Sequence, residues 1–389
     1  MRILVNASNL RTGGGVQKAV EFINGVVEWG GDHQWLFLTS PQVETNISFK
    51  TKCPNVRKAI IPITPAWWFA GHESRKTIKM LEHKFAPDVV FTVGGPAYIR
   101  FLAPHLMGYY VLWVMLPTKM AWSKIRGVRN KVRFWLWCRY NQFWAGFADR
   151  WVTETDVAAA GLAKRLRKPR EYVFVIPNSC SYIYFEAQKK ELDTHPGLRG
   201  RPADEYRLLV FTAYYSHKNL ESIPEVAAAL KAIDGKRKYC FVLTLESESS
   251  GWRSIQAQAV KLGVEDDIVN IGTQPVHLGP TLYRSCDALF MPTLLETFTA
   301  TYPEAMAMKR PIITTDLDFA RDICQDAAMF FIPDNARSAA EAIVAVSSDL
   351  ELAERLVAAG ERRLNDFGSS KERFQKCLNL LEETAKIKR

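Results

Sequence analysis

Cysteine is scarce and scattered in this chain of 389 residues. The cysteines are odd in number, and no two of them are spaced as C-x-x-C. This distribution argues against a disulfide framework and against a cysteine-based zinc site, and it favours a reducing cytosolic environment. The seven positions are Cys53, Cys138, Cys180, Cys240, Cys286, Cys324 and Cys377.

Long apolar runs are missing as well. The longest candidate, residues 106–116, falls short of the roughly 18 residues that a membrane-spanning helix needs, and it is better interpreted as a buried strand. Residues 1–6 are too brief an apolar run for a signal peptide, so we expect a strand there. The sequence therefore predicts a cytoplasmic protein with no spanning helix.

Acidic residues are nearly absent from one part of the chain. The net charge is +10, and residues 119–150 contain eight Lys or Arg but a single acid, Asp149. Such a balance suits a nucleic acid, an anionic membrane or a phosphorylated ligand. Because the basic stretch matches no nucleic-acid recognition motif, we do not expect nucleic acid as a partner.

The basic stretch is also rich in aromatic residues. We expect residues 119–147 to form a helix in which Val132, Leu136 and Phe143 share one face. Basic and aromatic composition is typical of a helix that lies in a membrane interface, but an ordinary helix with this face in the core fits equally well. The residues assigned to the membrane or acceptor side are Lys124, Arg126, Arg129, Lys131, Arg133 and Trp135.

Strand-like and helix-like segments alternate in both halves of the chain. A charged stretch rich in Pro and Gly, residues 186–206, is the best linker candidate. We therefore predict two domains, residues 1–190 and 191–369, with the final helix, residues 370–389, able to pack back onto the first. This α/β pattern predicts two doubly wound parallel sheets, with ligands bound at the carboxyl ends of the strands.

A glycine-rich turn follows the first predicted strand. Gly13, Gly14 and Gly15 precede a segment with helical apolar spacing that starts at Val16. Glycines let the backbone approach a ligand closely at a helix N-terminus. The turn does not match G-x-G-x-x-G, so a purely structural turn is equally compatible with it.

Two carboxylates stand out in the second half. Glu296 lies in a loop after the apolar strand 287–291, and Glu304 follows Pro303, which we expect to open a helix. An acid is favourable in the first turn of a helix. Lys218 follows the predicted strand 208–212, and a Lys at a strand-to-helix turn can neutralise a phosphate.

Residues 284–334 resemble the retaining glycosyltransferases of family 4, which have the GT-B fold. Glu296 and Glu304 keep the Glu-x7-Glu spacing of that family, with Pro292 before them and Pro311-Ile-Ile after them. The segment His217-Lys218-Asn219-Leu220 resembles the family's diphosphate-binding lysine motif, and Gly13-Gly14-Gly15 resembles its first loop. With these scattered blocks the resemblance covers most of the chain.

The resemblance implies roles for the matched residues. Glu296 would contact hydroxyls of the transferred sugar, and Lys218 would balance the diphosphate charge as the sugar–phosphate bond breaks. Glu304 would bind the ribose hydroxyls of the nucleotide. The donor-binding set is completed by Thr297, Phe298, Thr299, Ala300, His217, Asn219, Gly13, Gly14 and Gly15. No metal ion and no cofactor besides the nucleotide-diphosphate sugar are expected.

The sequence departs from the family at several positions. Thr297 and Thr299 stand where Gly is usual, which makes close backbone approach to the phosphate less secure. An Arg usually precedes the lysine by a few residues, but Ala213 or Tyr214 stands there. Part of the expected phosphate clamp is therefore missing from the motif.

The function predicted from these observations is transfer of a sugar, with retention, from a nucleotide-diphosphate donor. UDP is favoured as the nucleotide, and the acceptor would be a glycan or a lipid-linked molecule in surface polysaccharide or lipopolysaccharide synthesis. The protein would act at the inner face of the cell membrane. An inverting GT-B transferase, a sugar-nucleotide epimerase and a non-catalytic protein that binds nucleotide sugars or membranes are the alternatives.

Overall fold

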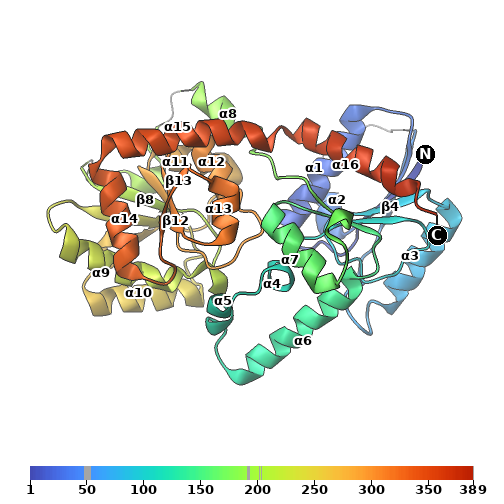
Figure 1. Cartoon of the computed structure of the whole chain (residues 1–389), viewed down its shortest axis with the longest axis horizontal. Coiled ribbons are helices and arrows are strands. Elements are labelled where there is room, and N and C mark those ends of the chain that lie inside the picture. The colour runs from blue at the N-terminus through green and yellow to red at the C-terminus, as the bar shows by residue number, and fades with distance from the viewer. Residues whose placement is uncertain (48–53, 191–192, 201, 203, 389) are drawn as a thin grey trace. The chain divides into compact units, whose positions relative to one another are not determined.

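The computed structural model describes residues 1–47, 54–190, 193–200, 202 and 204–388. It separates into two compact units (Figure 1). Unit 1 comprises Met1–Pro117, Gly127–Pro177 and Ser369–Arg389, and unit 2 comprises Thr118–Arg126 and Asn178–Gly368. Cys53 lies outside the described residues, and the other six cysteines are buried.

Unit 1 is built on a parallel sheet of seven strands in the order β3-β2-β1-β4-β5-β6-β7. The strands are β1 (Arg2–Ala7), β2 (Gln34–Thr39), β3 (Val56–Ile60), β4 (Val89–Thr92), β5 (His105–Gly108), β6 (Arg150–Thr153) and β7 (Val173–Val175). The helices are α1 (Gly13–Trp29), α2 (Pro41–Asn46), α3 (His72–Phe85), α4 (Leu112–Met115), α6 (Val128–Ala145), α7 (Asp156–Leu166) and α16 (Ser370–Ala385).

Helix α16 completes the core of unit 1 although it comes from the end of the chain. Phe374, Leu378 and Leu381 are buried in the same cluster as the inner face of α1 and strands β1 and β4. The rings of Phe22 on α1 and Phe374 lie 5.3 Å apart. Figure 1 shows α16, in red, beside α1.

Two predictions for the first half of the chain need correction. The apolar run 106–116 is not one strand, because β5 ends at Gly108 and the short helix α4 follows. The segment 119–147 is not one helix, because it is interrupted at Gly127, whose φ of 82° lies in the left-handed region that favours glycine. Helix α5 (Lys119–Ser123) precedes the break and α6 follows it.

Unit 2 is built on a parallel sheet of six strands in the order β10-β9-β8-β11-β12-β13. The strands are β8 (Tyr206–Val210), β9 (Tyr239–Leu243), β10 (Ile268–Asn270), β11 (Ala288–Met291), β12 (Ile312–Thr315) and β13 (Ala328–Phe331). The helices besides α5 are α8 (Tyr182–Gln188), α9 (Ile223–Ile233), α10 (Ser250–Leu262), α11 (Gly279–Arg284), α12 (Thr301–Ala307), α13 (Asp318–Cys324), α14 (Ala336–Ser348) and α15 (Leu350–Phe367).

The chain enters unit 2 after Pro177, earlier than the boundary expected at residue 190. The reason is helix α8, which belongs to unit 2: Tyr184 is buried and meets Tyr283 of α11 edge to face, with ring centroids 5.8 Å apart. The expected linker therefore contains ordered structure on both sides of residues 191 and 192, which lie outside the described residues. Leu198, for example, is buried.

The predicted fold class is confirmed: both units are Rossmann-like, with parallel sheets and helices packed on them. Both strand orders reverse direction once, between β1 and β4 in unit 1 and between β8 and β11 in unit 2. In doubly wound sheets such a reversal opens a crevice at the carboxyl ends of the two neighbouring strands, where ligands bind.

Candidate active site

The candidate active site in unit 2 lies where the strand order reverses. Lys218 comes from the loop that follows β8, and Glu296 comes from the loop that follows β11. Because β8 and β11 are neighbours and parallel, both loops leave the same edge of the sheet. The fold thus brings together two residues that are 78 positions apart in the sequence.

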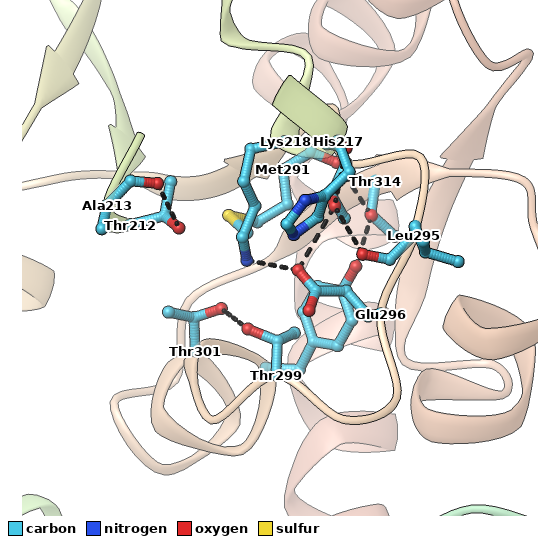
Figure 2. Close-up of polar contacts among 12 residues, drawn as sticks. Thr212, Ala213, His217, Lys218, Met291, Leu295, Glu296, Thr299, Thr301 and Thr314 are labelled. Carbon is cyan, nitrogen blue, oxygen red and sulfur yellow. Dashed lines mark hydrogen bonds and ion pairs between the residues drawn. The ribbon is translucent and has the colours of Figure 1, made fainter. Parts of the chain in front are cut away.

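Lys218 and Glu296 form a buried ion pair. The Lys218 Nζ contacts Glu296 Oε1, and the two side chains are only 10% and 8% exposed. The Thr293 hydroxyl donates a second hydrogen bond to Glu296 Oε1, at 3.2 Å. Figure 2 shows the Lys218 side chain reaching down to the Glu296 carboxylate. Two charges withdrawn from water in this way need accurate pairing, because each alone would be costly to bury.

Backbone contacts join the two loops into one structure. The Leu294 N–H donates to the His217 carbonyl at 2.7 Å, which ties the β11 loop to the β8 loop. The Thr315 hydroxyl donates to the Thr293 carbonyl at 2.7 Å and fixes the β11 loop to the end of β12. Asn219, with a φ of 55°, makes the left-handed turn directly after Lys218. The position of the ion pair is therefore set by the sheet.

His217 adds no positive charge to this site near neutral pH. Its ring is buried and stacks on Tyr215, with centroids 5.5 Å apart. Burial, with the neighbouring Lys218 charge as the second cause, lowers the pKa of His217 to about 3. Lys218 is thus the cation of the His217-Lys218-Asn219 segment.

Glu304 lies in the first turn of α12, as expected for an acid near a helix N-terminus. The helix begins at Thr301 rather than at Pro303, so the proline is the third helical residue and not the first. The Tyr283 hydroxyl donates to Glu304 Oε2 at 3.1 Å. Withdrawal from water raises the pKa of Glu304 to about 7, and hydrogen bonds from Tyr283 and Tyr184 oppose that rise.

Four more residues assigned to donor binding lie in the loop between β11 and α12: Thr297, Phe298, Thr299 and Ala300. Thr297 and Thr299 are buried, and the Thr299 hydroxyl lies 2.8 Å from that of Thr301. The Phe298 ring packs edge to face on Phe367 of α15, at 5.4 Å. That contact gives Phe298 a packing role in addition to any contact with a donor, and the donor contacts of the loop remain predictions.

Lys124 and Arg126 were assigned to the membrane side but lie in unit 2 with α5. The Lys124 Nζ pairs with Asp334 Oδ1 at 2.7 Å. The Asn219 side-chain amide also donates to Asp334 Oδ1, at 3.3 Å. The residue after Lys218 is therefore linked through Asp334 to the segment that precedes α6.

Helix α6 carries the remaining residues of the membrane-side assignment. Its apolar stripe is not in the core: Val132, Leu136 and Phe143 are 53%, 56% and 60% exposed. The side chains that α6 buries are on the opposite side and include Cys138 and Ala145. The basic residues Arg129, Lys131 and Arg133 are exposed, and Trp135 is 53% exposed.

The three glycines form the first turn of α1, at the strand reversal of unit 1. Gly13 has a φ of 68°, which favours glycine, while a Cβ added to Gly13 or Gly14 would meet no atom within 4 Å. A Cβ on Gly15 would lie 3.0 Å from Leu10. Open space around Gly13 and Gly14 is what a ligand-binding turn requires, and their place in a donor site shared with unit 2 stays a prediction.

Unit 1 also holds a partly buried polar cluster that was not predicted. The Lys18 Nζ on α1 pairs with Glu154 Oε1 at 2.7 Å and lies 3.6 Å from the centre of the Tyr110 ring. Glu154 follows β6, and Tyr110 follows β5. Lys18 and Tyr110 line a cavity of about 900 Å³ between α1 and α16. Glu154 and Tyr110 could have been found from their positions, because each comes within two residues of the carboxyl end of a strand.

One D-x-D triplet occurs in unit 2, at Asp316-Leu317-Asp318. Arg321 donates two hydrogen bonds to the Asp316 carboxylate, at 2.7 and 2.9 Å, and these bonds lower the pKa of Asp316. Among the described residues, no group of three or more His, Cys, Asp or Glu is arranged to hold a metal ion. In the same part of the chain, no helix is long and apolar enough to cross a membrane.

Comparison with known proteins gives a family match for unit 2. Residues 195–363 match the family model described as Glycosyl transferases group 1. This stretch contains Lys218, Glu296 and Glu304. No curated protein matches the sequence.

Solved structures resemble the whole chain. A glycosyltransferase from Rickettsia africae has a TM-score of 0.72 at 16% identity, with 100% of this chain and 99% of that one covered. HepE from Anabaena, in complex with UDP and glucose, has a TM-score of 0.68 at 13% identity, with coverage of 98% and 100%. WaaG, a glycosyltransferase involved in lipopolysaccharide biosynthesis, has a TM-score of 0.65 at 16% identity, with coverage of 98% and 99%.

The fold is that of the GT-B glycosyltransferases. At these identities the likeness establishes the architecture, and the chemistry has to be argued from the residues of the site.

Proposed function

We propose that the protein is a retaining glycosyltransferase that uses a nucleotide-diphosphate sugar. The observation that carries this proposal is the buried Lys218–Glu296 pair at the strand reversal of unit 2. It lies within the stretch that matches the glycosyl transferases group 1 model. A lone lysine or glutamate would carry no such implication, but a buried cation beside a buried carboxylate at the strand reversal of a doubly wound sheet does.

The pair suits the two ends of the bond that breaks. As the sugar–phosphate bond lengthens, negative charge grows on the diphosphate and the sugar becomes oxocarbenium-like. The Lys218 ammonium would stabilise the departing diphosphate, and the Glu296 carboxylate would accept hydrogen bonds from sugar hydroxyls. Because Lys218 supplies the positive charge, we expect turnover to continue when divalent metal ions are chelated.

Glu304 would hold the nucleotide. A carboxylate can accept two hydrogen bonds from the neighbouring hydroxyls of a ribose, and the hydroxyls of Tyr283 and Tyr184 keep the Glu304 side chain oriented. UDP is the nucleotide that we favour, because the structurally similar HepE was solved with UDP and glucose. Retention of configuration is inferred from the Glu-x7-Glu spacing of Glu296 and Glu304.

We place the acceptor with unit 1 and at a membrane. The exposed stripe of α6 beside exposed Arg129, Lys131 and Arg133 has the composition of an interfacial helix. WaaG, which has a similar fold, is involved in lipopolysaccharide biosynthesis. A lipid-linked or lipopolysaccharide acceptor at the inner face of the cell membrane accounts for both features.

The transfer reaction is tested by incubating the protein with a panel of nucleotide sugars and measuring nucleoside diphosphate release. We expect release by the wild type and a large loss in Glu296→Gln, with Glu341→Gln as the matched control because Glu341 pairs with Arg337 on the surface of α14. The anomeric configuration of the product, followed by NMR, should match that of the donor. Equal rates in wild type and Glu296→Gln would contradict the assignment of the site.

Membrane attachment is a separate part of the proposal. We expect the protein to sediment with vesicles that contain phosphatidylglycerol, and less so with pure phosphatidylcholine or at high salt. Serine substitutions at Val132 and Leu136 should weaken this binding. If the wild type shows no salt-sensitive binding, α6 does not face a membrane.

A further inference from the structure

A short loop in unit 1 exposes three consecutive large aromatic side chains. Trp67, Trp68 and Phe69 are 61%, 69% and 87% exposed, and they lie shortly before α3, which begins at His72. Aromatic residues contribute a large apolar area, so their exposure to water is unfavourable unless a partner covers them. Unlike α6, this loop has no basic or helical pattern in the sequence that marks it as an interaction surface.

The loop is held in one shape by hydrogen bonds from the side chain of Arg75, on α3, to its backbone carbonyls. The Arg75 guanidinium donates hydrogen bonds to the carbonyls of Pro65, Trp67 and Trp68, at 2.6, 3.0 and 2.6 Å. A Cβ at Gly71 would lie 2.5 Å from the Trp67 carbonyl oxygen, so glycine is required there. Because the backbone is fixed, little conformational entropy remains to be lost when the three rings bind a partner.

The loop is joined to α6. The Tyr140 hydroxyl donates to the Ala66 carbonyl at 3.0 Å, and the rings of Trp68 and Tyr140 lie 6.3 Å apart. Trp68 and Phe69 line a hollow of about 360 Å³ whose other walls include Tyr140 and Trp144 of α6. The aromatic loop and the exposed stripe of α6 therefore form one surface of unit 1.

We propose that residues 66–70 form an aromatic membrane anchor that inserts into the interface of an anionic bilayer next to α6. This inference rests on the membrane attachment proposed above and adds a second contact element to it. The rings would lie among the lipid headgroups and upper acyl chains, where amphipathic Trp side chains are favoured. Contact through both the loop and the length of α6 would fix the orientation of unit 1 on the membrane as well as its attachment.

The charge around the surface favours a bilayer over a second copy of the chain. Between residues 119 and 148 the chain has no acid, and the exposed basic residues of α6 border the apolar stripe. A two-fold interface would place this basic surface against itself, which is unfavourable. Anionic lipid headgroups instead supply the opposite charge.

The test compares three sets of serine substitutions in the full-length protein by sedimentation with phosphatidylglycerol-containing vesicles. The loop variant changes Trp67, Trp68 and Phe69, and the α6 variant changes Val132 and Leu136. The control variant changes Val260, Val276 and Leu350, which are 60%, 55% and 72% exposed in unit 2. Circular dichroism melting checks that each variant is folded, which we expect because the changed side chains are exposed.

We expect the loop variant to lose vesicle affinity by roughly tenfold or more, and the control variant to bind like the wild type. Replacing Trp67 and Trp68 with Phe should preserve most of the binding, since the apolar area is kept. Wild-type binding to vesicles combined with undiminished binding of the folded loop variant would overturn the anchor while leaving the α6 attachment in place.

Two other outcomes would also overturn the anchor. If the wild type binds no vesicles, the proposed membrane attachment fails together with the anchor. If the wild type is a dimer in analytical ultracentrifugation and the loop variant is a monomer, the surface joins two copies of the chain. Hydrolysis of the donor, or transfer to an acceptor dispersed in water, does not require the loop. An activity assay of this kind therefore tests the proposed transferase function independently of the membrane anchor.

Discussion

Lys218 and Glu296 depend on each other for their charges to be tolerated in the interior of unit 2. With both side chains about nine-tenths buried, removing one partner leaves the other charge uncompensated. We expect Lys218→Met or Glu296→Gln alone to lower the free energy of unfolding by about 3–5 kcal/mol. The double variant should recover part of that loss, as measured by urea unfolding, yet remain inactive.

This pattern separates a catalytic pair from a structural one. If the double variant regains stability and also turns over the donor, the pair serves only to hold the loops. Thr293→Val offers a milder control, because it removes one hydrogen bond to Glu296 and leaves the ion pair intact.

Glu304 gives the protein an unusual dependence on pH. Its pKa in the folded protein is about 7, above the ordinary value of 4.5, so the folded state retains a proton that the unfolded state loses between these values. The contribution of Glu304 to stability therefore falls as the pH rises from 4.5 to 7. The Glu304→Gln variant should lack this part of the pH dependence in thermal melting.

Donor binding should depend on pH in the opposite direction. Only the carboxylate form of Glu304 can accept two hydrogen bonds from ribose hydroxyls, so we expect nucleotide affinity to increase as the pH rises through about 7. Calorimetric titration with UDP on both sides of that value measures the change. A pH-independent affinity in the wild type would contradict the ribose-binding role.

At the scale of elements, a ligand-binding role of the glycine turn of α1 can be tested by the substitution Gly14→Ala, which adds a single methyl group. A Cβ at Gly14 has open space and a helical backbone, so Gly14→Ala should leave the free energy of unfolding unchanged or raise it by up to about 1 kcal/mol. If the backbone approaches a ligand there, turnover should fall. An unchanged turnover rate in Gly14→Ala would mean that the turn is purely structural. Gly13→Ala cannot replace this test, because the positive φ of Gly13 would strain any residue with a Cβ.

Two lysines on either side of Gly127, Lys124 and Lys131, should affect different properties of the protein. Lys124 contacts Asp334, which also binds the Asn219 amide beside Lys218, whereas Lys131 lies exposed on α6. We expect Lys124→Ala to reduce turnover by roughly fivefold or less, because the pair is partly exposed, and Lys131→Ala to reduce vesicle binding instead. If Lys124→Ala reduced vesicle binding and left turnover unchanged, Lys124 would belong to the membrane-binding surface.

Elements were predictable from the sequence where a local pattern determines them. The alternating strands and helices, the loop that carries Glu296 and the loop that carries Lys218 all follow from short-range spacing. The break at Gly127 and the end of β5 at Gly108 were missed, since an apolar or aromatic run does not show where its backbone must turn. The aromatic loop at Trp67 was missed because its exposure follows from the tertiary position of Arg75 and Tyr140.

At the scale of the whole molecule, unit 1 depends on the last helix of the chain. Leu381 is fully buried in the core of unit 1, so Leu381→Ala should lower the free energy of unfolding of that unit by about 2–5 kcal/mol. Leu350→Ala, at a side chain that is 72% exposed in unit 2, should change stability by less than about 0.5 kcal/mol. Differential scanning calorimetry can follow both, and equal effects would contradict the division into units.

The two-domain architecture and the fold class could be predicted because each half of the chain repeats the same alternation. The packing of the final helix onto unit 1 was also predicted, but the individual partners of charged side chains from distant segments could not be predicted. The Lys18–Glu154 pair joins residues 136 positions apart, and Asp334 meets Lys124 across 210 positions. No local spacing encodes these partners, since they are set by which loops the sheet brings to one edge.

The central claim is that a nucleotide sugar binds at the Lys218–Glu296 pair of unit 2. Isothermal titration calorimetry with a panel of nucleoside diphosphates tests it most directly, with wild type, the Lys218→Met variant and the Lys309→Met control, whose lysine pairs with Glu361 at the surface. We expect one nucleoside diphosphate to bind the wild type and the control equally, and Lys218→Met much more weakly. Equal affinity for wild type and a folded Lys218→Met, or no binding to the wild type by any member of the panel, would contradict the claim.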